Sequence, residues 1–217
     1  MGNMKRGILA ILFFLSFPLQ GIWAQPVGTD EVIQRLKEVR EKTRDFSADL
    51  LQEKKVSMLK EKLLSRGRIR YKYPDKVSIE FFEPTASQMV FDGKTLILYY
   101  REEKAAERYQ AQSSLMVEKY LLFSQDPFQE KLAAWKLVED RDSSLVMEIL
   151  PRGEDFPFVK ARFWISKEDW MVTGMELVEK NGDTTLLRYS NIRLNTGLTD
   201  SDFELRLPGD VKVTDVQ

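Results

Sequence analysis

The segment from residue 66 to residue 100 contains runs in which apolar and polar side chains alternate. Between residues 68 and 73 every second residue is apolar and the others are basic, and the same period of two recurs between residues 77 and 81. This period is typical of a strand with one face on a core and the other in water. Pro74-Asp75 and Asp92-Gly93 separate the runs, and such dipeptides favour reversals of the chain. The segment therefore predicts consecutive antiparallel strands.

The chain before and after this segment adds a helix and more strands. Val32, Leu36 and Val39 have helical spacing, which predicts an amphipathic helix capped at Thr29-Asp30 and running to about residue 43. Alternation also predicts strands at residues 45–55, 137–141, 144–150, 159–166, 171–180 and 184–195, and near residue 211. Asn181-Gly182 predicts a hairpin turn of the primed type.

Residues 113–136 are too apolar for a surface loop and lack strand alternation. They predict one or two short helices, divided at Asp126-Pro127 because proline restricts the preceding residue and favours a helix start. The predicted fold is mostly β in an α+β arrangement. It is one strongly curved antiparallel sheet of about ten strands, with an N-terminal helix and a mid-chain helical insertion on its concave side.

Residues 1–24 have the pattern of a signal peptide. Lys5-Arg6 precede an apolar stretch, and Ile22-Trp23-Ala24 form a plausible cleavage tripeptide. The alternative is an uncleaved anchor, but the apolar run is shorter than the roughly 20 residues that a span needs. We expect export to the periplasm and a single domain over residues 25–217.

The composition argues against most enzyme classes. The chain has no histidine and no cysteine, which excludes Ser-His-Asp and Cys-His catalysis, His/Cys zinc sites and lipidation of an N-terminal cysteine. Its 33 basic and 34 acidic residues are interleaved, which argues against a nucleic-acid surface. Adjacent acids at Glu139-Asp140 and Glu168-Asp169 leave a carboxylate-dependent hydrolase as an alternative, although neighbours in a strand point to opposite faces. We expect a non-enzymatic protein without cofactor or metal.

An apolar face is the positive signal. We expect one side of the sheet to carry Phe46, Leu50, Ile69, Tyr71, Ile79, Phe81, Leu96, Leu98, Trp164 and Leu187. Such a face forms either the filled core of a structural adaptor or a cavity for an apolar guest such as an acyl chain. Periodicity does not distinguish the two.

Several short motifs follow one another along the chain. They are Phe-x-Ala-x-Leu-x-Gln at residues 46–52, Gly67, Lys72-Tyr73-Pro74-Asp75, Pro84, Asp92-Gly93-Lys94-Thr95-Leu96 and the C-terminal run of residues 203–213. In this order, behind a signal peptide, the chain resembles the LolA-like family of periplasmic lipoprotein carriers over essentially all of residues 25–217.

The resemblance implies a half-barrel with a helical lid that holds lipoprotein acyl chains. The chains would be received from an inner-membrane ABC-transporter complex and passed to an outer-membrane acceptor. Val77, Ile79 and Phe81 match cavity-facing positions, and Leu121, Leu122 and Phe123 match the lid. Tyr73 stands where the family commonly has a latching arginine, so the latch is expected to be weaker, relocated or missing.

The resemblance implies a carrier that acts as a monomer and shields acyl chains from water. Within the same fold, the alternatives are a glycolipid-binding or other lipid-binding protein and a sensor of mislocalised lipoproteins.

Overall fold

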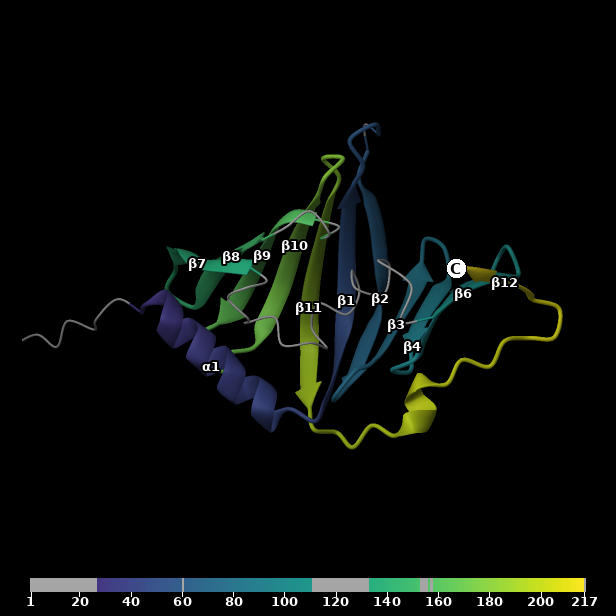
Figure 1. Cartoon of the computed structure of the whole chain (residues 1–217), viewed down its shortest axis with the longest axis horizontal. Helices are drawn as coiled ribbons and strands as arrows, with labels where there is room; N and C mark the ends of the chain where they lie inside the picture. Colours follow the sequence, from purple (N-terminus) through teal and green to yellow (C-terminus); the bar gives the residue numbers. More distant parts are fainter. Residues whose placement is uncertain (1–26, 60, 111–132, 153–155, 157, 217) are drawn as a thin grey trace, which may run out of the picture.

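The computed structural model describes residues 27–59, 61–110, 133–152, 156 and 158–216, and these form one twelve-stranded curved sheet with a single α-helix (Figure 1). About ten strands were expected. The elements are α1 (Thr29–Lys42), β1 (Asp45–Lys55), β2 (Leu63–Lys72), β3 (Lys76–Glu83), β4 (Ser87–Phe91), β5 (Thr95–Tyr100), β6 (Ala105–Gln110), β7 (Ala133–Asp140), β8 (Ser144–Pro151), β9 (Phe158–Ser166), β10 (Val172–Glu179), β11 (Thr184–Leu194), the short 3-10 helix η1 (Asp200–Phe203) and β12 (Lys212–Val216).

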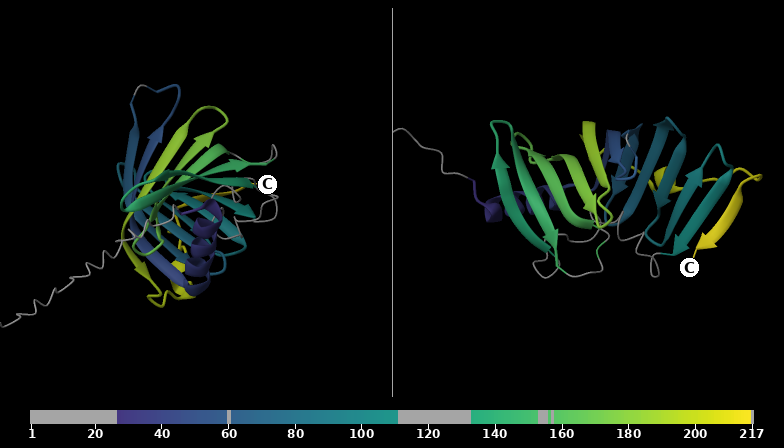
Figure 2. Two further views of the ribbon diagram at one scale, coloured as in Figure 1. Left: turned by 90° about the vertical axis from the view of Figure 1, so that its left-hand side faces the viewer. Right: turned by 90° about the horizontal axis from the view of Figure 1, so that it is seen from above.

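The sheet consists of two meanders that meet in its middle. Strands β1 to β6 pair in order, strands β7 to β11 pair in order, and β1 pairs with β11 to join the two sets (Figure 2). All of these pairs are antiparallel, whereas β12 adds to the outer side of β6 in parallel. Long-range pairing between β1 and β11 thus makes one continuous surface from two locally paired halves.

Strand pairing also defines the two faces of the sheet, because directly opposed residues project to the same side. Helix α1 packs on Leu145, Met147 and Ile165 through Val32 and Leu36, whose side chains are 0% and 7% exposed. We call this side the α1 face and the other side the opposite face. Sequence predicted the amphipathic helix and its apolar stripe correctly.

The cap of α1 differs from the expectation. Gly28 is the N-cap residue and supplies no side-chain hydrogen bond. The Thr29 hydroxyl oxygen instead accepts a hydrogen bond from the Leu137 N–H at 3.1 Å. This residue therefore ties the helix to β7.

The region after residue 100 departs further from the sequence expectations. Residues 101–104 form a turn, and the strand β6 that follows it was not predicted. Residues 133–136 belong to β7, so the predicted helical insertion is wrong at its C-terminal end. Residues 113–132 lie outside the described part of the chain. Trp135 and Leu137 lie on either side of Lys136 and pair with Ile149 and Met147 of β8, which explains the strand.

The turn at Asn181-Gly182 is not of the primed type. Only Gly182 has a positive φ, of 84°, and its N–H donates to the Glu179 carbonyl at 3.0 Å. The Glu179 N–H donates to the Asp183 carbonyl at 2.8 Å. This is a three-residue loop in which glycine takes the left-handed position after an ordinary turn. At the other predicted glycine turn, Gly93 has a φ of 96°.

The segment between β11 and β12 is fixed to the opposite face near the start of β1. Asp45 is 4% exposed, and its carboxylate accepts hydrogen bonds from the Thr196 N–H at 2.7 Å and the Gly197 N–H at 3.1 Å. Further along, Asp200 forms salt bridges with Lys72 at 2.7 Å and Lys76 at 3.0 Å. In Figure 1 this segment runs from the end of β11 past η1 to β12. Among the described residues, no helix is long and apolar enough to cross a membrane.

Candidate functional site

The α1 face carries most of the residues that sequence reasoning selected. Following the paired residues from β9 across to β6 puts ten of them on this one side of the sheet. They are Phe46, Leu50, Ile69, Tyr71, Val77, Ile79, Phe81, Leu96, Leu98 and Leu187. The prediction that these side chains share a face is therefore confirmed for all ten.

Trp164 is the exception. It lies opposite Val146 and Gly174 in the sheet, while its neighbours Phe163 and Ile165 project to the α1 face. The prediction that Trp164 shares the apolar face was wrong, because Phe163, Trp164 and Ile165 are all apolar and hide the alternation. The charged residues Lys160 and Arg162 are on the same side of β9 as Trp164, and they could have indicated that this side faces away from the apolar face. The indole lies against Gly174, where a Cβ would be in ordinary van der Waals contact with Trp164 Cε3 at 3.5 Å.

Two clusters of buried side chains lie on this face. One spans β2 to β6 and contains Tyr71, Val77, Met89, Phe91, Leu96, Leu98 and Tyr109. The other spans β7 to β10 and contains Ala133, Ile149, Phe158, Ala161, Phe163, Met175 and Leu177. All seven members of the second cluster were missed, as were Met89, Phe91 and Tyr109 of the first. Met89, Val90 and Phe91 are three consecutive apolar residues, so β4 carried no alternation that could have identified Met89 and Phe91.

Some predicted residues are less enclosed than these clusters. Phe46, Ile79, Phe81 and Leu187 are half-buried. Phe81 stands between Gly67 on β2 and Ser87 on β4, and both of these cross-strand neighbours are small. Because the Phe81 side chain is only half-buried, part of it stays accessible from the α1 face.

Gly67 is required at its position by the closeness of β3. A Cβ there would lie 2.1 Å from the main-chain oxygen of Glu80, far inside van der Waals contact. The sheet also has an irregularity at this point, between Arg66 and Gly67. A bulge of this kind bends a strand and increases its twist. Gly67 therefore contributes to the curvature beneath Phe81.

Tyr73, at the position of the expected latch, lies just beyond the end of β2. Its side chain is 58% exposed, and its N–H donates to the Arg44 carbonyl at 2.8 Å. The neighbouring Tyr71 hydroxyl donates to the Pro74 carbonyl at 3.0 Å. Burial raises the pKa of Tyr71, so this hydroxyl stays protonated. The three residues of the expected lid, Leu121, Leu122 and Phe123, lie outside the described residues.

The acidic pairs considered for hydrolysis are distributed along the sheet margin. Glu139 forms a salt bridge with Arg141, and Asp140 with Lys167. Glu168 and Asp169 are exposed in the turn between β9 and β10. In the described part of the chain, no group of three or more Asp or Glu residues is placed to hold a metal ion.

Comparisons with known proteins give a consistent result. Residues 41–206 match the family model described as outer membrane lipoprotein carrier protein LolA. An outer-membrane lipoprotein carrier protein of Idiomarina loihiensis is 25% identical over 98% of this chain and 99% of its own length. The corresponding protein of Dechloromonas aromatica is 24% identical over 97% of both chains.

A solved structure gives a likeness of fold alone. An uncharacterized conserved protein from Thermus thermophilus superposes with a TM-score of 0.54 at 13% identity, covering 86% of this chain and 98% of its own. The family match extends over more than half of the sequence and includes β1 to β11, which together form the apolar face. The chain therefore belongs to the family of the outer membrane lipoprotein carrier protein LolA.

Proposed function

We propose that this protein is a periplasmic carrier that shields the acyl chains of lipoproteins on its α1 face. The observation that carries the proposal is the extent of that face. It is apolar across both buried clusters, whereas the described contacts of α1 are concentrated on strands β7 to β9. Family membership and the carrier names of the relatives support the same function.

The physical task explains why an apolar surface is sufficient. Exposing one acyl CH₂ to water costs about 0.8 kcal/mol, so moving two or three long chains through water costs on the order of tens of kcal/mol. A carrier lowers this cost by replacing water with apolar side chains. It needs no nucleophile, general base or metal for this. Binding on one face of an open sheet also allows release without breaking a covalent bond.

The rest of the proposed pathway follows from this role. A signal peptide over residues 1–24 would deliver the single domain 25–217 to the periplasm. There the carrier would receive lipoproteins from an inner-membrane ABC-transporter complex and deliver them to an outer-membrane acceptor. Residues 121–123 would cover the bound chains, and Tyr73 would take the place of the family's latching arginine.

The test is native mass spectrometry of the protein purified from the envelope of its own cells. An acylated protein bound at a one-to-one ratio is the expected result. Protein that is bare, and that also fails to bind a fluorescent fatty acid, would contradict the proposal. That outcome would point to a structural adaptor with a filled core, an alternative favoured by the near-complete burial of Phe91 and Leu96. A bound glycolipid would instead assign the same face to a different lipid.

A further inference from the structure

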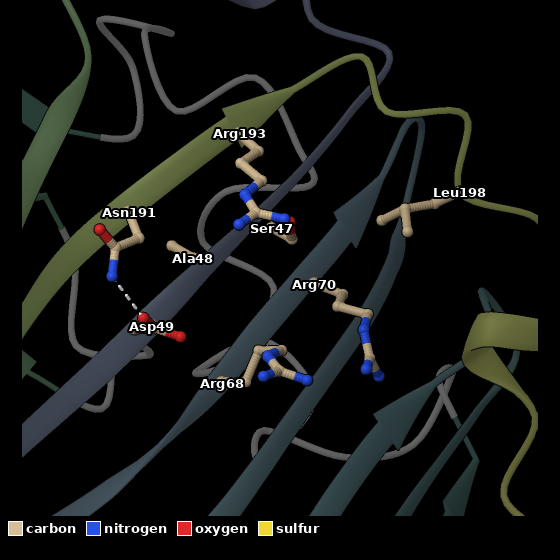
Figure 3. Close-up of a pocket in the computed structure, with 8 residues that line it drawn as sticks. All are labelled: Ser47, Ala48, Asp49, Arg68, Arg70, Asn191, Arg193 and Leu198. Carbon is tan, nitrogen blue, oxygen red and sulfur yellow. Dashed lines mark hydrogen bonds between the residues drawn. The ribbon is translucent and has the colours of Figure 1, made fainter.

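A polar hollow of about 360 Å³ lies on the side of the sheet that faces away from α1. It is formed where β1, β2 and β11 run side by side, and Figure 3 shows three arginine side chains around it. Arg68 and Arg70 come from β2, and Arg193 comes from β11. Arg193 and Arg70 flank Ser47 from its two sides, and Arg68 lies opposite Asp49. The pairing of the three strands therefore places all three arginine side chains around the same hollow.

A bulge between β1 and β11 shapes this hollow. Ser47 pairs with Arg193 and Asp49 pairs with Ser190, so β11 has one residue more than β1 between the two pairs. Asn191, in the bulge, has a φ of 51°, which is uncommon for a residue other than glycine. Its amide donates to Asp49 Oδ2 at 2.7 Å (Figure 3). Bulges and left-handed residues of this kind gather at functional sites, where they redirect side chains.

Among the residues that line the hollow, three are arginines and one is an acid. In the part of the chain that the structure describes, none of the three arginines forms a salt bridge. Elsewhere on the opposite face Arg162 is paired with Glu148 at 3.0 Å. The one carboxylate of the hollow, Asp49, already accepts a hydrogen bond from Asn191.

Acids outside the lining offset part of the positive charge, because Glu80 lies opposite Arg68 on β3 and Asp202 interacts electrostatically with Arg70. Arg68 also lies over the Phe82 ring, 6.0 Å from its centroid. The lining itself holds three guanidinium groups and one carboxylate, which leaves a local excess of positive charge.

We propose that this hollow is a binding site for a phosphoryl group. A guanidinium presents a planar fork of N–H donors that matches phosphate and carboxylate oxygens. Three forks that approach from two strands match the three outer oxygens of a phosphate monoester better than the two oxygens of a carboxylate. Ser47 and the Asn191 amide line the same hollow. The site lies on the other side of the sheet from the acyl-chain face, so the two ligands would not compete for space.

The test is a calorimetric titration of the full exported chain with inorganic phosphate and with pyrophosphate. We expect saturable binding that Arg193→Ala weakens by about tenfold or more, because a hydrogen bond between charged groups contributes about 1.5–3 kcal/mol. Arg193→Lys keeps the charge but loses the fork, and should also weaken binding. The matched control is Arg188→Ala, an exposed arginine on the same strand and face but outside the hollow. It should change the affinity less than about twofold.

A second arm distinguishes a lipid headgroup from a free phosphate. Vesicles of phosphatidylglycerol and of phosphatidylcholine are compared by sedimentation, with pyrophosphate as competitor. Binding only to phosphatidylglycerol vesicles, reduced by Arg193→Ala but not by Arg188→Ala, assigns a lipid source. Binding of pyrophosphate alone assigns a soluble one. The proposal is overturned if neither phosphate nor vesicles bind, if both alanine variants lose affinity equally, or if an oligoglutamate peptide binds more tightly than pyrophosphate. Fatty-acid binding by Arg193→Ala should stay at the wild-type level, which separates this test from that of the carrier function.

Discussion

At the scale of single residues, the α1 face depends on a few positions that local pattern alone does not explain. Gly67 occurs within a run of alternating residues, where a side chain would be expected by propensity. The structure supplies the reason, because the main-chain oxygen of Glu80 would lie only 2.1 Å from a Cβ at this position. Sequence does not reveal such a contact, because it depends on how closely a neighbouring strand passes.

Gly67→Ala should destabilise the protein by about 2–4 kcal/mol, because β3 must move to accept the methyl group. Urea unfolding followed by circular dichroism measures the change. Gly209→Ala is the matched control, since a Cβ there would have no atom within 4 Å. Equal stability of the two variants would show that the sheet adapts to the added carbon without cost.

Phe81 and Phe91 provide a contrast between a binding position and a core position on the same face. Phe81 is half-buried, whereas Phe91 is 2% exposed. Phe81→Glu should keep the fold but weaken fatty-acid binding by about tenfold or more, since the new carboxylate can reach water while repelling an apolar guest. Phe91→Glu should unfold the domain or cost several kcal/mol, because it buries an unpaired charge. Circular dichroism and fluorescent fatty-acid titration separate the two effects, and unfolding by Phe81→Glu would assign Phe81 to a packed core.

At the scale of elements, a strand was predicted correctly where apolar and polar residues alternate clearly along it. Strand β1 was predicted at residues 45–55 and is found there, because apolar and polar side chains alternate over residues 45–50. Strand β6 has the sequence AAERYQ, with two small residues and little contrast between faces. Its position is fixed by pairing with β5 and with the distant β12. Strand β9 was placed correctly, but the face to which Trp164 points was not. Phe163, Trp164 and Ile165 are three adjacent apolar residues, so no alternation shows which of them points to which face.

The contact between β1 and the segment after β11 should make the protein sensitive to acid. Burial alone would raise the pKa of Asp45, but hydrogen bonds from the Thr196 hydroxyl and from the N–H groups of residues 196–198 hold this pKa below its ordinary value. A lowered folded-state pKa contributes stability that is complete above the unfolded pKa of about 3.9 and is lost as pH falls through the folded value.

Asp45→Asn should cost about 1–3 kcal/mol at neutral pH, because an amide cannot accept hydrogen bonds on both of its polar atoms. The same variant should lose less stability than wild type between pH 5 and pH 2, as measured by urea midpoints across that range. Asp142→Asn, at an exposed turn position, serves as the control and should behave like wild type. A wild-type acid profile in Asp45→Asn would locate the acid sensitivity elsewhere.

At the scale of the whole molecule, the local patterns do not specify which strands meet in the middle of the sheet. The β1–β11 ladder joins residues such as Leu50 and Tyr189, which are far apart in sequence. Nothing in the periodicity of either strand names its partner. The general fold class and ten of the eleven candidate face residues could nevertheless be predicted from the sequence. In each strand, a set of alternate apolar residues is enough to define which side faces the core.

The absence of histidine gives a prediction for the protein as a whole. No histidine is present to change its charge near pH 6.5. We expect the free energy of unfolding to change by less than about 0.5 kcal/mol between pH 6 and pH 8. Fatty-acid affinity should be equally constant over this range. Urea titrations and fluorescence titrations at four pH values test both, and a transition near pH 7 would require a carboxyl or amino group with a displaced pKa.

Strand β12 has a consequence for biogenesis. It follows every other strand in the sequence, and it covers the outer side of β6 through the parallel pairing of Lys212–Val216 with residues 105–109. A chain whose C-terminal end has not yet emerged into the compartment where it folds must therefore keep one row of peptide groups on β6 unpaired, and such an edge recruits strands from other molecules. Termination before Lys212 should yield a product that self-associates, which analytical ultracentrifugation would detect as heavy species missing from the complete polypeptide.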